Sequence, residues 1–276
     1  MTATTTTPRG KGDGNGNGTA GTFTPNPGPA PLGRMISAQA ALETKMLLRN
    51  GEQLLLTVVI PTLLLVLFST VDVVDVGKLA AGQDRVDFLA PGLLALAVLS
   101  TAFTGQAIAT GFERRYGVLK RLGATPLPRW GLMVAKTACV LVVELLQVVL
   151  LGAIAFALGW SPHGNPAAVL LLLVLGTAAF SGLGLLMAGT LRAEATLAAA
   201  NLVFILLLVG GGVIVPLDKF PGAVANVLDL TPIAALSDGL RDVLQHGAAM
   251  PWADAGILAV WAVLGLAAAA KWFRWE

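Results

Sequence analysis

Six apolar runs, each long enough to cross a lipid bilayer, constrain the fold of this 276-residue chain more than any other feature. An α-helix rises about 1.5 Å per residue, so about 20 apolar residues span the hydrocarbon core. Only 12% of the residues are charged, about half the share in a typical soluble domain. We therefore predict an all-α, polytopic membrane protein with six spans, at about residues 54–71, 88–112, 131–159, 167–191, 195–215 and 252–270.

The residues before the first span divide into two parts. Residues 1–33 are rich in Thr, then in Gly and Asn, then in Pro, a composition that predicts a disordered cytoplasmic tail. Residues 34–50 predict an amphipathic helix in the headgroup plane, with Lys45 and Arg49 flanking an apolar side of Met35, Ile36, Leu42, Met46 and Leu47. We expect residues 34–276 to form one transmembrane domain.

The distribution of basic residues predicts the orientation of the spans. Cytoplasmic segments of membrane proteins carry an excess of Lys and Arg. If both termini are cytoplasmic, four basic residues lie outside: Lys78, Arg85, Lys219 and Arg241. Fourteen lie inside: Arg9, Lys11, Arg34, Lys45, Arg49, Arg114, Arg115, Lys120, Arg121, Arg129, Lys136, Arg192, Lys271 and Arg274. We therefore predict a multi-pass protein of the plasma or inner membrane with both termini in the cytoplasm.

The segment between the second and third spans, residues 113–136, is the most basic part of the chain and is called the basic loop. It holds six Lys or Arg residues, and Glu113 is its only acid. Glu113 to Leu122 can form about three helical turns, which Gly123, Pro126 and Pro128 would end. Charge alone leaves two interpretations open: a helix that contacts a cytoplasmic partner, or a basic loop held by anionic lipid.

The basic loop resembles that of ABC-2-type exporter permeases. In that family a Glu, a Gly four residues later and a Leu-x-x-Leu run precede Thr-Pro, and here these are Glu113, Gly117, Leu119, Leu122, Thr125 and Pro126. Val118 stands where many members carry Thr. The resemblance implies a coupling helix that docks on a separate ATPase subunit, with Glu113, Arg114, Gly117, Leu119, Lys120, Leu122 and Pro126 as ATPase-coupling residues.

Residues 216–247, between the fifth and sixth spans, are too charged to cross a membrane and too apolar for an ordinary loop. Thr231 and Pro232 predict a helix start. After it, an apolar face of Leu236, Leu240, Val243 and Leu244 lies opposite Asp238, Arg241 and Asp242. We predict a broken pair of short helices in the outer leaflet. This segment also resembles the ABC-2 family, through Pro216, Leu217, Pro221, Leu230 and Pro232.

Polar residues inside the spans are candidates for a translocation path. Glu144 lies halfway between Trp130 and Trp160, and Gln147 follows one turn later. A carboxylate in a membrane span is a candidate functional site, or else a group hydrogen-bonded to a neighbouring helix. Thr104 and Gln106 in the second span complete the candidates.

The chain is predicted not to be an enzyme. The ATP-binding pattern Gly-x-x-x-x-Gly-Lys-Ser/Thr does not occur, so ATP and Mg²⁺ would bind to a partner and no cofactor to this chain. Asp72-x-x-Asp75 and Asp84-x-x-Asp87 weakly resemble the Mg²⁺-diphosphate sites of intramembrane prenyltransferases. An ion- or proton-coupled secondary transporter that uses Glu144 is a stronger alternative.

The resemblance implies a permease that works as a dimer, with a second copy or a related permease, together with an ABC ATPase subunit and the membrane lipid. Its cargo would be a hydrophobic or amphiphilic molecule such as a drug, an antibiotic or a lipid-like compound, moved out of the cytoplasm. No nucleic-acid partner is expected, because the tail offers only Arg9 and Lys11. The sequence leaves open the cargo, the ATPase and the choice between a homodimer and a heterodimer.

Overall fold

The computed structural model describes residues 28, 30–71, 84–213 and 221–274. The chain divides into two units, Met1–Ala30 and Pro31–Glu276, and all the described helices belong to the second. The predicted disordered tail therefore lies almost wholly outside the described residues. The first five residues of the segment 216–247, which include Pro216 and Leu217, lie outside them too.

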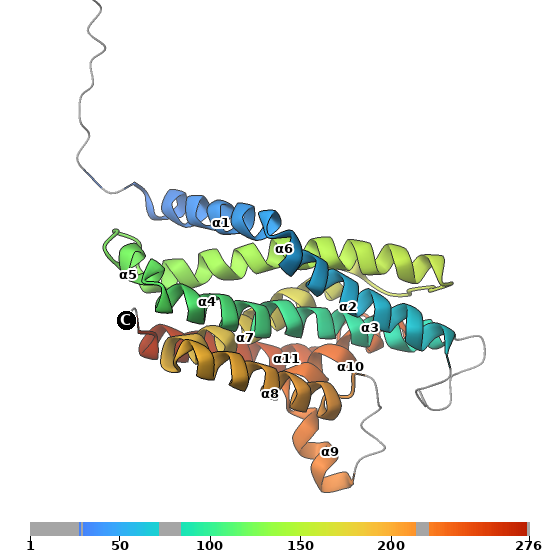
Figure 1. Cartoon of the computed structure of the whole chain (residues 1–276). Helices are drawn as coiled ribbons and strands as arrows, with labels where there is room; N and C mark the ends of the chain where they lie inside the picture. Colours follow the sequence, from blue (N-terminus) through green and yellow to red (C-terminus); the bar gives the residue numbers. More distant parts are fainter. Residues whose placement is uncertain (1–27, 29, 72–83, 214–220, 275–276) are drawn as a thin grey trace, which may run out of the picture. The chain divides into compact units, whose positions relative to one another are not determined.

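Every regular element in the described ranges is a helix, as predicted (Figure 1). Five helices there are long and apolar enough to cross a membrane: Arg85–Arg115, which comprises α3 (Arg85–Val98), η1 (Leu99–Gly105) and α4 (Gln106–Arg115), then α6 (Arg129–Ala157), α7 (Pro166–Thr190), α8 (Ala193–Gly210) and α11 (Trp252–Trp272). The first predicted span corresponds to α2 (Gly51–Thr70), whose part Thr57–Thr70 is a shorter apolar helix. The remaining helices are α1 (Leu32–Arg49), α5 (Val118–Gly123), α9 (Gly222–Asp229) and α10 (Pro232–Leu244).

The helix Arg85–Arg115 differs from the predicted second span in two ways. It starts three residues early, because the Asp87 carboxylate accepts a hydrogen bond of 2.9 Å from the backbone amide of Asp84 and so closes the first turn. Pro91 consequently lies inside α3 and not in its first turn. The middle of the helix, η1, has π-helical hydrogen bonding, an irregularity that the apolar pattern does not reveal.

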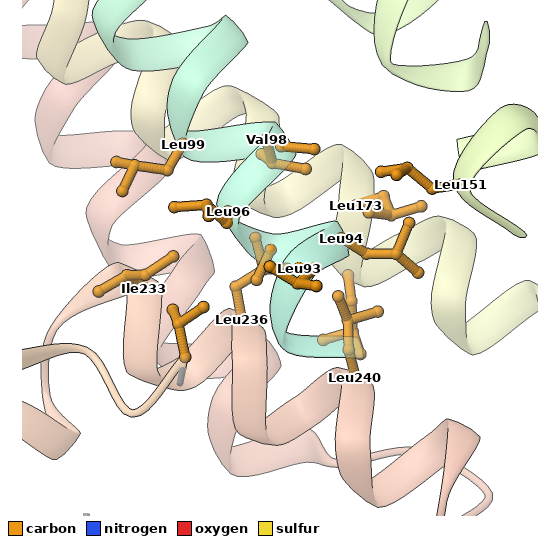
Figure 2. Close-up of a cluster of buried hydrophobic side chains, with 14 of the residues drawn as sticks. Leu93, Leu94, Leu96, Val98, Leu99, Leu151, Leu173, Ile233, Leu236 and Leu240 are labelled. Atoms are coloured by element: carbon orange, nitrogen blue, oxygen red, sulfur yellow. The ribbon is translucent and has the colours of Figure 1, made fainter. Parts of the chain in front are cut away.

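The same helix is the centre of the packing. Of its apolar stretch 89% is buried inside the protein, against 22–56% for the other four long helices. Figure 2 shows how its leucines fill the core: Leu93 and Leu96 of α3 lie beside Leu236 of α10. On another side, Leu94 lies near Leu151 of α6 and Leu173 of α7.

The closest helix pair is α7 with α11, and glycines permit it. A Cβ atom added to Gly182 would lie only 2.6 Å from the backbone nitrogen of Leu266, and Gly265 faces Gly182 in return. Small residues let membrane helices approach in this way. Gly182 and Gly265 thus allow α7 and α11 to pack closely.

The helix bundle of the second unit has two opposite ends, and each end has its own contacts between segments. At the loop end, where α4 and α11 finish and α6 begins, Arg129 Nη1 donates to the carbonyl oxygen of Phe273 at 3.2 Å. At the α10 end, the backbone nitrogen of His163 donates to the carbonyl oxygen of Leu244 at 2.9 Å. The basic loop therefore lies at one end of the spans and α10 packs at the other.

Candidate functional site

The predicted single helix from Glu113 to Leu122 is wrong, because the structure breaks it in two. α4 ends at Arg115, and α5 begins at Val118. Between them Gly117 has φ = 71°, in the left-handed region, which stops α-helical hydrogen bonding and favours glycine. The predicted helix end at Gly123 is confirmed.

The short helix α5 is fixed to the ends of the spans by its leucines. Leu119 is completely buried, and Leu122 packs beside it. Both contact the loop-end cluster, a group of buried apolar residues from α6, α7, α11 and the adjoining loops: Leu127, Leu132, Met133, Leu185, Ala269 and Phe273. Two of the predicted ATPase-coupling residues thus face the protein interior and hold α5 in place.

The outward side of the basic loop combines aromatic, apolar and cationic side chains. Tyr116, the only tyrosine of the chain, is 66% exposed and lies in the turn between α4 and α5. We call this surface the docking face; its members are Tyr116, Val118, Lys120, Arg121 and Pro126, all exposed. Aromatic and Arg side chains are enriched in protein interfaces. Tyr116 is not among the residues predicted for this site, although a lone aromatic residue beside a glycine in a charged loop is a signal that could have identified it.

The arginines at the end of α4 are bound within the chain. Arg114 donates to the carbonyl oxygen of Leu191, and Arg115 forms an ion pair with Glu194. Both contacts connect α4 to the turn between α7 and α8. Arg114, predicted to contact the ATPase, therefore positions this end of α4.

Glu113 and Lys136 belong to a charged cluster below the docking face. Lys136 Nζ lies 2.7 Å from Glu113 Oε2 and 3.0 Å from Glu43 Oε2, and the Lys136 side chain is only 4% exposed. We call these three residues the charged triad; it joins α1, α4 and α6. The carboxylate of Glu113, one of the expected ATPase-coupling residues, is already engaged inside the chain.

The four translocation-path candidates contact different neighbours. Glu144 is buried and accepts a hydrogen bond from Thr177 of α7. Gln147 accepts from Thr101 Oγ1 at 3.0 Å and donates to the carbonyl oxygen of Thr57 at 2.9 Å.

The two candidates in the second span, Gln106 and Thr104, also have different surroundings. Gln106 accepts from Ser181 Oγ at 2.7 Å and lines a cavity between α1, α4 and α6. Thr104 is half-buried. These contacts hold helices together, and Gln106 in addition lines the cavity.

At the α10 end, the predicted helix start is confirmed and the predicted place of Arg241 is wrong. The Thr231 side chain accepts from the backbone nitrogen of Ala234, with Pro232 in the first turn. Arg241 is 6% exposed, so it does not lie on the polar face. Its guanidinium donates to Val213 O at 2.7 Å and to Asp238 at 2.9 Å.

Aromatic contact and burial complete the environment of Arg241. The guanidinium carbon lies 4.1 Å from the centre of the Phe88 ring, within cation–π distance. Burial raises the pKa of the Asp238 carboxyl above its usual value, while the charge of Arg241 opposes that shift. Through the Phe88 ring and the carbonyl oxygen of Val213, the buried Arg241 thus fastens α10 to the start of α3 and to the residues just after α8.

The aspartates considered for a metal-diphosphate site do not form one in the described ranges. Asp87 accepts backbone hydrogen bonds from Asp84 and, at 3.2 Å, from Ser161. Asp72 and Asp75 lie outside the described residues. Among the residues the structure describes, no group of three His, Cys, Asp or Glu side chains could hold a metal ion.

The helices and the exposed basic loop define a multi-pass membrane protein. A family model described as ABC-2 type transporter matches residues 36–244, well over half of the chain, so the chain belongs to this family and is a membrane permease. The permease domain of the family lacks an ATPase site, binds no cofactor itself and implies an ATPase partner. A search of curated proteins found no match.

Proposed function

We propose that this chain is the membrane subunit of an ATP-driven exporter that moves a hydrophobic or amphiphilic substrate out of the cytoplasm. A separate ATPase subunit would bind the docking face and hydrolyse the ATP. The observation that carries this proposal is an exposed aromatic and cationic surface on a helix that buried Leu119 fixes to several spans. Membership of the family implies an ATPase partner, and the docking face is the surface to which we propose that it binds.

The anchoring of α5 suggests how movement of the ATPase reaches the membrane. The loop-end cluster takes side chains from α6 (Leu132, Met133), α7 (Leu185) and α11 (Ala269), so a displacement of α5 acts on three spans together. Packed interfaces respond to such a push by shifting between discrete arrangements. Closure of the ATPase subunits on ATP would thus change the populations of inward- and outward-facing states of a permease dimer.

The charge distribution supports a cytoplasmic loop end. Among the described residues, those at the α10 end include two basic residues, Arg85 and Arg241. The loop end carries Arg114, Arg115, Lys120, Arg121, Arg129, Lys136, Arg192, Lys271 and Arg274. We accordingly place both termini in the cytoplasm, and α9 and α10 at the outer leaflet. We also place α2 in the membrane, as the first of six spans in chain order.

The helix α1 fits the position of an interfacial elbow before the first span. Its Leu42 and Met46 are exposed and apolar, as expected for contact with lipid. Met35 and Ile36, in contrast, pack against the loop-end cluster. We propose that α1 lies in the cytoplasmic headgroup layer and that residues 34–276 form the transmembrane domain.

Cysteine labelling tests the orientation on which export depends. In a Cys139→Ser background, Val227→Cys on α9 should react with an impermeant maleimide added to intact cells. Thr125→Cys at the loop end should react only after the membrane is permeabilised. Both positions are exposed, so the reverse labelling pattern would refute the orientation and, with it, the proposed site of ATPase binding.

A charge reversal tests the docking face itself. The double variant Lys120→Glu, Arg121→Glu should abolish ATPase binding and transport while leaving the protein folded, since both side chains are exposed. Arg192→Glu, also exposed and basic but outside the docking face, serves as the control. Equal loss in both would show that basic charge in general, for example through lipid binding, is what matters.

A further inference from the structure

A cavity of about 330 Å³ lies between α1, α4, α5 and α6, and its walls differ in chemistry. The polar wall includes the charged triad (Glu43, Glu113, Lys136) together with Gln106 and Thr110. The apolar wall includes Leu42, Met46, Val118, Leu122, Val140 and Val143. Its volume falls within the range of small-molecule sites, about 300–1,000 Å³.

The charged triad leaves this cavity with a surplus of negative charge. Two carboxylates share one ammonium group, Lys136 Nζ, so one negative charge remains without a counter-charge inside the triad. Among the described residues that line the cavity, these three are the ones that carry charge. The carboxylates of Glu43 and Glu113 are partly buried, with 17% and 28% of their side chains exposed. A cation that enters the cavity would therefore be stabilised by the unbalanced negative charge.

Two buried polar groups in the same wall lack partners. Gln106 is 6% exposed and Thr110 is 0% exposed. Within the described part of the chain, Gln106 Nε2 and Thr110 Oγ1 find no hydrogen-bond partner. Buried polar atoms are nearly always satisfied in native proteins. Independently of the charge, these two atoms can therefore bond to the hydrogen-bonding groups of a ligand in the cavity.

We propose that this cavity binds an amphiphilic organic cation, namely an alkylammonium group on an apolar body that carries a hydrogen-bond acceptor. The ammonium group lies against Glu43 and Glu113, the acceptor receives a hydrogen bond from Gln106 Nε2, and the apolar body rests on the wall of Leu42, Val118 and Val140. Val118 and Leu122 of α5 belong to this wall, so an occupied cavity contacts the element that carries the docking face. As a cargo site the cavity rests on the proposed export function; as a binding site it does not.

Binding is tested with the purified permease in nanodiscs of phosphatidylglycerol and phosphatidylcholine, without ATP or an ATPase. The probe is dansylcadaverine, which combines a primary ammonium, sulfonyl acceptors and a fluorescent naphthalene. Its matched neutral analogue is N-pentyl dansylamide. We expect saturable binding of dansylcadaverine and at least tenfold weaker binding of the neutral analogue. Equal affinity for both would overturn the proposal.

Two variants locate the probe in the cavity. Glu43→Gln removes the surplus charge, yet Lys136 keeps Glu113 as its ion partner, so the fold should persist and dansylcadaverine should bind about tenfold more weakly. Thr110→Val removes a hydroxyl that has no partner among the described residues, and it should weaken binding about threefold without loss of stability. Glu194→Gln, an exposed carboxylate outside the cavity, is the matched control and should leave binding unchanged.

The outcomes distinguish a lipid headgroup from a soluble amine as the source of the cation. They also distinguish failure of the cavity proposal from failure of the export proposal. Competition by phosphatidylethanolamine added to the nanodiscs would identify a lipid headgroup as the occupant; no competition would indicate a soluble amine. Unchanged binding in both cavity variants would overturn the site and attribute the signal to partition into the apolar surface. Failure of export with intact probe binding would refute the export function alone.

Discussion

The basic residues of α5, at one end of the spans, and the arginine of α10, at the other end, lie in opposite environments. At the loop end, Lys120 and Arg121 are exposed on α5, and Arg115 pairs with Glu194 at the surface. At the α10 end, Arg241 is buried, with its guanidinium bonded to Asp238 and Val213. The same charge thus lies at the surface of α5 at one end and forms internal contacts in α10 at the other. The difference supports the proposal that the loop end meets the partner.

Removal of Arg241 should have the largest effect on stability. Arg241→Met leaves the carbonyl oxygen of Val213 without its charged donor and removes the cation–π contact with Phe88, and these losses together cost about 2–4 kcal/mol. Arg121→Met at the loop end should change the free energy of unfolding by less than about 0.5 kcal/mol. Thermal unfolding in detergent measures both. Similar values for the two variants would remove the distinction between the ends.

A methyl group added at Gly92, next to the Arg241 contacts, should have the next largest effect on stability. A Cβ atom on Gly92 would lie 2.4 Å from Val213 O and 2.8 Å from Arg241 Nη2, so Gly92→Ala should destabilise the protein by about 1–3 kcal/mol. Gly152→Ala is the matched control, because its Cβ would meet nothing within 4 Å. In the same unfolding assay the control should be neutral or slightly stabilising, since Ala favours helix. A neutral Gly92→Ala would contradict the tight packing at the α10 end.

At the loop end, substitution of Gly117 separates backbone strain from contact with a partner. Its φ of 71° disfavours any residue with a Cβ atom, so Gly117→Ala should cost about 1 kcal/mol, whereas Gly117→Asn should cost less because Asn tolerates this region. A larger residue such as leucine would strain the turn even without a partner, so the test uses Ala and Asn in its place. If ATPase stimulation is lost in both variants although Asn keeps the unfolding temperature, Gly117 provides close approach to the partner. Full stimulation in the Asn variant would limit its role to the turn.

Glu144→Gln should have the smallest effect. The amide oxygen can still accept the hydrogen bond of Thr177, so the free energy of unfolding should change by less than about 1 kcal/mol. ATP-dependent transport should continue, because no titratable group at this position is needed. Loss of transport in a folded, ATPase-bound variant would favour the proton-coupled alternative.

The features that depend on local sequence were predictable. The long apolar helices follow from hydropathy, and the start of α10 follows from Thr231 and Pro232. Each of these depends on residues near one another in the chain. They suffice to predict an all-α membrane protein.

The features that the sequence did not reveal depend on distant partners. Lys136 was grouped with the exposed basic loop, because nothing local shows that Glu43, 93 residues away, binds it. Arg241 was placed opposite the leucines of α10 by helical periodicity, but its long side chain reaches Val213 in another segment. The break at Gly117 depends on a backbone angle that Leu119, buried against other helices, helps to fix.

Site-specific photo-crosslinking tests the central claim, that the docking face binds an ATPase, most directly. The photoreactive amino acid p-benzoylphenylalanine would replace Tyr116 at the loop end or Val227 at the other end, where the native residues are 66% and 68% exposed. We predict that Tyr116 crosslinks in native membranes to a protein whose peptides include an ATP-binding Gly-x-x-x-x-Gly-Lys-Ser/Thr motif, and that Lys120→Glu, Arg121→Glu abolishes this product. Val227 should give no such product. An ATPase crosslink at Val227, or none at Tyr116 in a folded protein, would contradict the account.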